Sequence, residues 1–145
     1  MKFKTITGGT EAEALAKFPW LADATFEKAV IDITQDYLVW KDGFWENGTW
    51  ERGTWRGGTW KNGIWRGGTW KNGIWERGIW MGGVWERGTW EGGTWKDGLM
   101  WSNIHQEYKR VAYEDGKFTV EGAEPAVEEI TIAEAEARLG VKIIT

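Results

Sequence analysis

The chain contains no cysteine and a single histidine among its 145 residues. Without cysteine there is no disulfide framework, no thiolate metal site and no cysteine nucleophile. The one histidine, His105, argues against a histidine-based triad and a two-histidine metal site, and we interpret it as a polar residue of the surface or of a cap. The glycines lie in a repeat, without the strand, glycine loop and helix that a nucleotide-binding motif requires. We therefore expect that the protein is not an enzyme, has no catalytic residue and binds neither a metal ion nor a cofactor.

The sequence also lacks a long hydrophobic run. No apolar stretch approaches the length that spans a membrane, and residues 1–9 do not have the composition of a signal peptide. We therefore expect one cytoplasmic domain that does not bind a membrane. The formal charge of −4 is distributed unevenly, with −2 on residues 1–39, +2 on residues 40–101 and −4 on residues 102–145.

Tryptophan and glycine are abundant instead, and both follow a strict period of five. Glycine occurs at position 43 and at every fifth position through 98. A fixed short period is typical of a solenoid or another repeat array, so it decides the fold before any single element does. Twelve of the fourteen tryptophans lie in this array, at Trp40, Trp45, Trp50, Trp55, Trp60, Trp65, Trp70, Trp75, Trp80, Trp85, Trp90 and Trp95.

A period of five requires a bend in every unit. Side chains alternate along a strand, so an unbroken strand would place successive tryptophans on opposite faces. A bend once per unit keeps all of them on one side. The repeat glycine, usually preceded by Asn, Asp or Gly, supplies residues that tolerate left-handed backbone. Two architectures fit: a β-solenoid with a corner in every unit, or a meander of very short hairpins.

The charged residue after each tryptophan favours a solenoid with four units in each coil. At a spacing of twenty residues, six of eight pairs have opposite charge and one has like charge, whereas at fifteen residues the counts are four and three. Opposite charges on neighbouring strands stabilise each other. One such column would be Glu46–Arg66–Glu86. The same spacing aligns Thr49 with Thr69.

The five-residue unit resembles the pentapeptide repeat, with tryptophan as the large central residue and glycine as the small residue two positions earlier. The resemblance covers about 60 residues. It implies a right-handed, four-sided β-helix that points both residues inward. We therefore predict a mainly β fold: a short four-sided β-solenoid of about three coils with small α/β caps at both ends. The predicted parts are an N-terminal cap (1–39), the solenoid (40–101) and a C-terminal cap of β-hairpin, helix and strand (102–145).

Local signals predict the elements of the two caps. Before the array we expect strands at 1–7 and 25–33 and a helix from 10 to 18 with a capping box between Thr10 and Glu13. After the array we expect two strands within 108–120 around Asp115-Gly116 and a helix capped by Thr131 and ended at Gly140. A last strand at 141–145 could pair with the strand at 1–7.

Each indole in the core carries an N–H group that needs an acceptor. We expect carbonyls beside the repeat glycines to serve. Any indole without an acceptor could face outward and form a binding surface for a sugar.

Five cations form a basic belt around the middle of the array. We interpret it as a column of surface ion pairs, and the alternative is a site for phosphate groups. Its residues are Arg52, Arg56, Lys61, Arg66 and Lys71.

We therefore predict a non-enzymatic interaction or scaffold module of the kind found among bacterial or phage accessory proteins. Its expected partner is another protein, with self-association left open. The alternative is a protein that binds a nucleotide, nucleic acid or glycan through exposed tryptophans and the basic belt.

Overall fold

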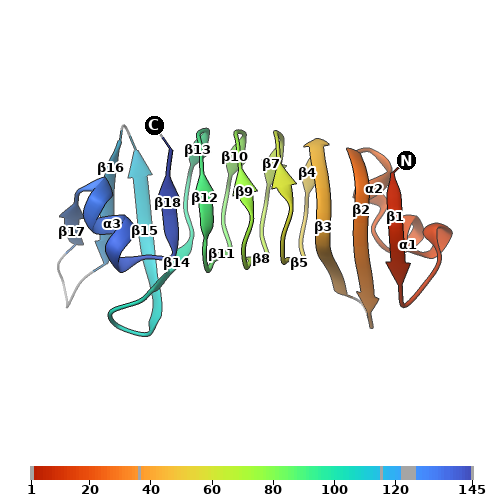
Figure 1. Cartoon of the computed structure of the whole chain (residues 1–145), viewed down its shortest axis with the longest axis horizontal. Helices are drawn as coiled ribbons and strands as arrows, with labels where there is room; N and C mark the ends of the chain where they lie inside the picture. Colours follow the sequence, from red (N-terminus) through yellow and green to blue (C-terminus); the bar gives the residue numbers. More distant parts are fainter. Residues whose placement is uncertain (1, 36, 115, 122–126, 145) are drawn as a thin grey trace.

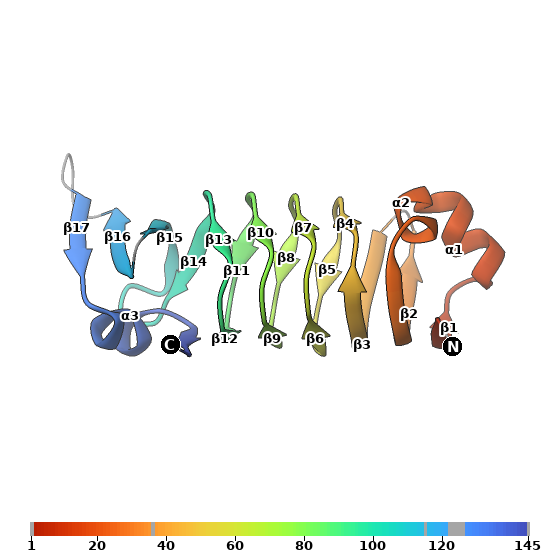
Figure 2. The same ribbon diagram turned by 90° about the horizontal axis from the view of Figure 1, so that it is seen from above.

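The computed structural model describes residues 2–35, 37–114, 116–121 and 127–144. The chain forms an elongated, mainly β body, in which a β-solenoid of about four coils lies between two end structures (Figure 1). Helices α1 and α2 lie at the N-terminal end of the body and helix α3 at the other end (Figure 2). The predicted solenoid with caps at both ends is confirmed.

Each coil contains fifteen residues, so the solenoid has three sides. Strand β3 (Tyr37–Asn47) pairs in parallel with β5 (Thr54–Trp55), and Trp40 lies opposite Trp55. Strand β8 (Thr69–Trp70) follows β5 with the same spacing. The prediction of four sides, about three coils and a twenty-residue period is therefore wrong in these details.

The short strands of the solenoid stack into three sides, which we call side A, side B and side C. Side A contains the N-terminal half of β3, β5, β8, β11 (Val84–Trp85) and β14 (Leu99–Ser102). Side B contains the C-terminal half of β3, β6 (Thr59–Trp60), β9 (Ile74–Trp75) and β12 (Gly88–Trp90). Side C contains β4 (Thr49–Trp50), β7 (Ile64–Trp65), β10 (Ile79–Trp80) and β13 (Thr94–Trp95).

The size of the indole ring explains why three units close a coil. The rings of Trp40, Trp45 and Trp50 contact one another pairwise, with centroid distances of 5.8, 5.8 and 6.4 Å and steep interplanar angles. A triangle of edge-to-face rings fills the centre of the coil, and such contacts are a favoured aromatic geometry. Four rings at the corners of a square could not all contact one another. Core packing therefore outweighs the weak surface charge pairs that favoured twenty residues.

Two interactions join each coil to the next. Indoles fifteen residues apart stack face to face, as Trp60 and Trp75 do at 4.8 Å with planes 5° apart. Backbone hydrogen bonds connect the same strands; for example, the N–H of Lys71 donates to the carbonyl oxygen of Trp55 at 2.7 Å. Every coil thus repeats the contacts of the coil below it, which produces a straight, regular body (Figure 1).

The repeat glycine forms the corner that the odd period requires. The twelve glycines from 43 to 98 have φ between +100° and +143°, a region that residues with a Cβ rarely adopt. Successive corners also lie very close together. A Cβ added to Gly63 would collide with the carbonyl oxygen of Gly48, one coil below.

The N-terminal cap covers the first coil with a strand pair and two short helices. Strand β1 (Phe3–Thr7) pairs in parallel with β2 (Thr25–Thr34), which pairs antiparallel with β3. Helix α1 (Glu11–Lys17) has the predicted capping box, and α2 (Pro19–Ala22) follows it. Strand β3 continues from the cap into the array, so the backbone passes position 40 without a break.

The C-terminal cap combines an antiparallel sheet with a helix and a last strand. Met100 of β14 takes the inward place of a tryptophan and lies opposite Trp85. The sheet continues through β15 (Glu107–Glu114), β16 (Lys117–Glu121) and β17 (Val127–Ile130). The predicted hairpin is confirmed, although Asp115 of its turn lies outside the described residues. Helix α3 (Ile132–Arg138) has the expected capping box at Thr131.

The last strand pairs at the opposite end of the body from the predicted partner. Strand β18 (Val141–Ile143) stacks in parallel on β12, where Ile143 lies opposite Trp90. It therefore adds one more strand to side B. The expected pairing with residues 1–7 is wrong, because four coils separate the two ends and β1 pairs with β2 instead.

Candidate functional site

The array tryptophans form the core of the solenoid and leave no indole surface for a ligand. Ten of the twelve are 0% exposed, and Trp90 and Trp95, near the C-terminal end, are 3% and 5% exposed. Stacking in columns and contact within each coil cover both faces of the rings. The alternative in which these indoles bind a sugar is therefore wrong.

The indole N–H groups are only partly satisfied by the expected carbonyls. Trp65 and Trp75 donate to the carbonyl oxygens of Gly82 and Gly92 at 3.1 and 3.0 Å, and both acceptors precede a repeat glycine. The cap supplies acceptors for Trp85 and Trp95. Among the described residues, seven further array indoles have buried N–H groups without an acceptor: Trp40, Trp45, Trp50, Trp55, Trp60, Trp70 and Trp80. Burial of the large ring surface outweighs the free-energy cost of an N–H group without an acceptor, so these indoles still point inward.

The five cations of the basic belt are spread over all three sides and do not form one site. Three of them lie near glutamates fifteen residues away in sequence: Lys61 at 3.7 Å from Glu46, Arg66 at 3.8 Å from Glu51, and Lys71 at 3.9 Å from Glu86. These three surface ion pairs of the belt lie one on each side of the solenoid. The predicted partners twenty residues away are wrong, because the coil has fifteen residues.

Side A nevertheless brings three cations together in a column. The backbone N–H groups of Arg56 and Lys71 donate to the carbonyl oxygens of Trp40 and Trp55, which places Lys41, Arg56 and Lys71 on three successive coils. Neighbouring strands lie about 4.8 Å apart. Lys41 is 4.0 Å from Asp32 and Lys71 is near Glu86, whereas Arg56 has no ion pair within the described part of the chain.

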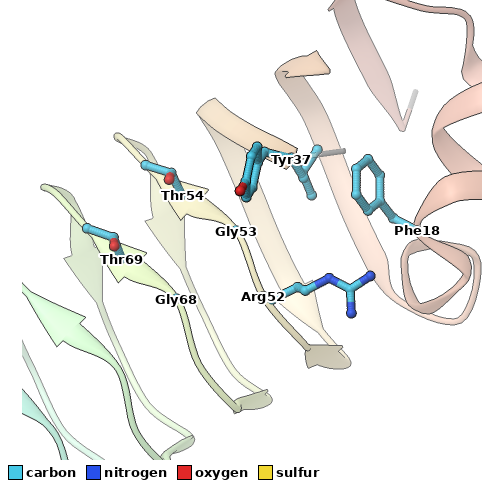
Figure 3. A pocket seen from close by; sticks show the side chains of 8 residues that line it. Phe18, Tyr37, Arg52, Gly53, Thr54, Gly68 and Thr69 are labelled. Atoms are coloured by element: carbon cyan, nitrogen blue, oxygen red, sulfur yellow. The ribbon is translucent and has the colours of Figure 1, made fainter. Parts of the chain in front are cut away.

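A groove of about 420 Å³ lies where the N-terminal cap meets side A. Tyr37 stands beside Gly53 and Thr54, and Arg52 extends along the groove toward the side of Phe18 (Figure 3). The side chain of Tyr37 is 65% exposed, whereas Phe18 and Leu38 are buried. Gly68 and Thr69 continue the lining on the next coil. Sequence reasoning singled out Arg52 but missed the groove, because only the fold brings Phe18 and Arg52 together.

The hairpin of β14 and β15 exposes apolar residues at the other end of the body. Ile104, in its turn, is 56% exposed, and Tyr108 is 37% exposed. The ring of Tyr108 meets that of Trp101 edge to face at 5.0 Å. Partial burial, and then the neighbouring carboxylate of Glu86, raise the pKa of Tyr108 above its ordinary value.

Two ion pairs involve residues of this hairpin. The guanidinium of Arg110 donates to both carboxylate oxygens of Asp97, at 2.7 and 2.9 Å. Lys109 lies 2.9 Å from Glu107, and the hydrogen bond from Lys109, followed by its charge, lowers the pKa of Glu107. Charged groups of the hairpin therefore border its two exposed apolar residues, Ile104 and Tyr108, an arrangement common in protein interfaces.

The described residues contain no group of three or more His, Cys, Asp or Glu side chains that could hold a metal ion. None of the helices in the described ranges is long and apolar enough to cross a membrane. Comparison of the chain with protein-family models, curated proteins and solved structures found no match. The fold thus defines a tryptophan-rich β-solenoid with a five-residue repeat, consistent with a pentapeptide-like repeat.

Proposed function

We propose that this protein is a non-enzymatic interaction module, in which the solenoid is a rigid scaffold and the C-terminal cap binds another protein. The observation that carries the proposal is the pair of exposed apolar residues, Ile104 and Tyr108, on the hairpin of β14 and β15. Its turn residue Ile104 is more than half exposed, and Tyr108 packs on Trp101 beside it. Exposed aromatic and aliphatic residues with charged neighbours are typical of the centre of a protein interface.

Regular packing of the solenoid supports the role of scaffold. Stacked indoles and repeated backbone hydrogen bonds fix each coil on the next. Such an array holds a loop in a defined place, and specific contacts usually lie on irregular segments held by a rigid frame. The hairpin projects from the body at its C-terminal end (Figure 1). The cytoplasmic location and self-association stay predictions.

The experiment compares capture of proteins from a lysate of the source cells by two variants of immobilised protein. The hairpin variant carries Ile104→Ser and Tyr108→Ser. The matched control carries Phe44→Ser and Ile74→Ser, which remove two exposed apolar residues, each 40% exposed, from side B. We expect the hairpin variant to lose a partner that the wild-type protein and the control both retain. Loss by the control alone would place the interface on the solenoid and contradict the proposal.

A second candidate function, binding of a nucleic acid, is favoured by the cation column on side A. Lys41, Arg56 and Lys71 present positive charge on successive strands, and Arg56 has no ion pair among the described residues. Phosphate contacts make binding weaken steeply as salt rises. A fluorescent single-stranded oligonucleotide tests this candidate. The candidate is supported if the affinity for the oligonucleotide falls with rising salt and in Arg56→Gln but not in Arg77→Gln. Equal affinity of the two variants would exclude the cation column as the binding site.

A further inference from the structure

We propose that the groove between the N-terminal cap and side A binds an acidic saccharide, a pyranose sugar that carries a carboxylate. The groove combines one exposed tyrosine ring, one cation and two threonine hydroxyl groups, and its volume of about 420 Å³ lies in the range of small-molecule sites. This site is separate from the hairpin and does not depend on the function proposed above.

The guanidinium of Arg52 supplies the charge that selects an acid. Arg52 occupies the corner between side C and side A, and within the described residues it forms no ion pair or hydrogen bond. Its side chain extends along the groove toward the side of Phe18 (Figure 3). A guanidinium can bind a carboxylate through two parallel hydrogen bonds. The carboxylate of a ligand would therefore accept hydrogen bonds from N–H groups of Arg52 that have no acceptor among the described residues.

Tyr37 and the threonines favour a sugar over an aromatic acid. The ring of Tyr37 is 65% exposed, which leaves room for the apolar face of a pyranose to stack on it. Thr54 and Thr69 lie opposite each other on successive coils, so their hydroxyl groups repeat at about 4.8 Å along the groove. An open groove leaves one face of the ligand in water. This suits a sugar, whose hydroxyl groups need hydrogen-bond partners, better than an aromatic ring, which has no such need.

The side-chain environment also explains why the groove is stable without a ligand. Phe18 and Leu38 form its apolar wall and are buried in the core, at 2% and 1% exposure. The glycines Gly53 and Gly68 belong to the corners of two stacked coils. A preformed site of this kind loses little conformational entropy on binding.

The test is a titration of the whole protein with glucuronic acid, followed by the backbone amide NMR signals of Gly53 and Gly68. Glucose serves as the uncharged sugar, benzoate as the aromatic acid and sulfate as the bare anion. We expect saturable shifts of both amides with glucuronic acid and about tenfold weaker binding of glucose, since the guanidinium contact is lost. Equal or tighter binding of benzoate or sulfate would overturn the assignment to a sugar acid, as would the absence of saturable shifts.

Two variants and a matched control separate the roles of the residues. Arg52→Gln should weaken binding of glucuronic acid about tenfold and abolish the preference over glucose. Tyr37→Leu should weaken both sugars, because the stacking ring is lost. Arg77→Gln changes an arginine at the same position of another repeat, outside the groove, and should leave binding unchanged. Equal losses in Arg52→Gln and Arg77→Gln would show a general charge effect and contradict the proposal.

Discussion

Trp55 stacks on Trp70, fifteen residues further along the chain, with ring centroids 5.0 Å apart and planes 4° from parallel. The backbone register is the same, because Thr54 and Trp55 pair directly with Thr69 and Trp70. Side-chain stacking and backbone pairing thus specify one coil length. The same stacking occurs on the other two sides, as between Trp60 and Trp75 and between Trp65 and Trp80, so three indole pairs hold each coil on the next.

The fifteen-residue coil predicts which surface charges are coupled. Arg66 lies 3.8 Å from Glu51, and both groups are more than one-third exposed. In a double-mutant cycle of Glu51→Arg and Arg66→Glu, we expect the exchanged pair to recover stability lost in the single variants, by about 0.2–1 kcal/mol in low salt. Free energies of unfolding from urea titrations measure this. The matched cycle of Arg66 and Glu86, twenty residues apart, should show no coupling, and the opposite outcome would contradict the coil length.

The sequence predicts the solenoid correctly because its period, its glycines and its tryptophans all depend on local geometry. The charge pattern predicts the wrong coil length, because exposed charge pairs contribute little free energy. The packing of the rings in three dimensions decides the number of sides instead. Trp40 and Trp50 are close only because the backbone turns through two corners between them. Spacing alone does not reveal that contact.

The capping boxes at Thr10 and Thr131 were predictable because they depend on residues three positions apart. Long-range relationships were not. Pairing of β18 with β12 joins residues that no sequence pattern connects. The groove formed by Phe18, Tyr37 and Arg52 has the same origin, since its lining comes from the cap and from two coils.

The corner glycines should tolerate no Cβ. Gly63 has φ of +124°, and a Cβ there would collide with the carbonyl oxygen of Gly48. We expect Gly63→Ala to destabilise the protein by more than about 2 kcal/mol, because backbone strain and steric overlap add. Gly116→Ala is the control, since Gly116 also has positive φ but no atom within 4 Å of an added Cβ, and it should cost about 1 kcal/mol. Chemical denaturation measures both, and equal losses would show that close approach of the coils is unimportant.

The ion pair of Arg138 and Glu128 should make one carboxyl group unusually acidic. Arg138 donates two hydrogen bonds of 3.0 Å to Glu128, and these bonds, then the charge of Arg138, lower the pKa of Glu128. Because the folded pKa lies below the unfolded one, the stabilisation is complete above the unfolded pKa and disappears as pH falls through the folded pKa. Arg138→Gln should raise the pKa of Glu128 toward its ordinary value in a carbon-13 NMR titration. Arg110→Gln, which breaks the pair with Asp97, should leave it unchanged; a shift in both variants would contradict a local cause.

Trp70 and Trp75 allow a matched test of what each indole contributes. Both are 0% exposed and stack between tryptophans of the coils above and below. Only Trp75 has an acceptor for its N–H, the carbonyl oxygen of Gly92 at 3.0 Å, whereas the N–H of Trp70 has none among the described residues. Trp70→Ala should cost about 3–5 kcal/mol because it leaves a cavity.

Replacement by phenylalanine removes the N–H group while it keeps an aromatic ring. Trp75→Phe should lose the hydrogen bond to Gly92 and leave that carbonyl without its donor, whereas Trp70→Phe removes a buried donor that has no acceptor. We therefore expect Trp75→Phe to destabilise the protein by about 1 kcal/mol more than Trp70→Phe does. Denaturant unfolding followed by circular dichroism measures the difference. If Trp70→Phe costs as much as Trp75→Phe, the indole hydrogen bonds contribute nothing beyond ring volume, and packing alone holds the stack together.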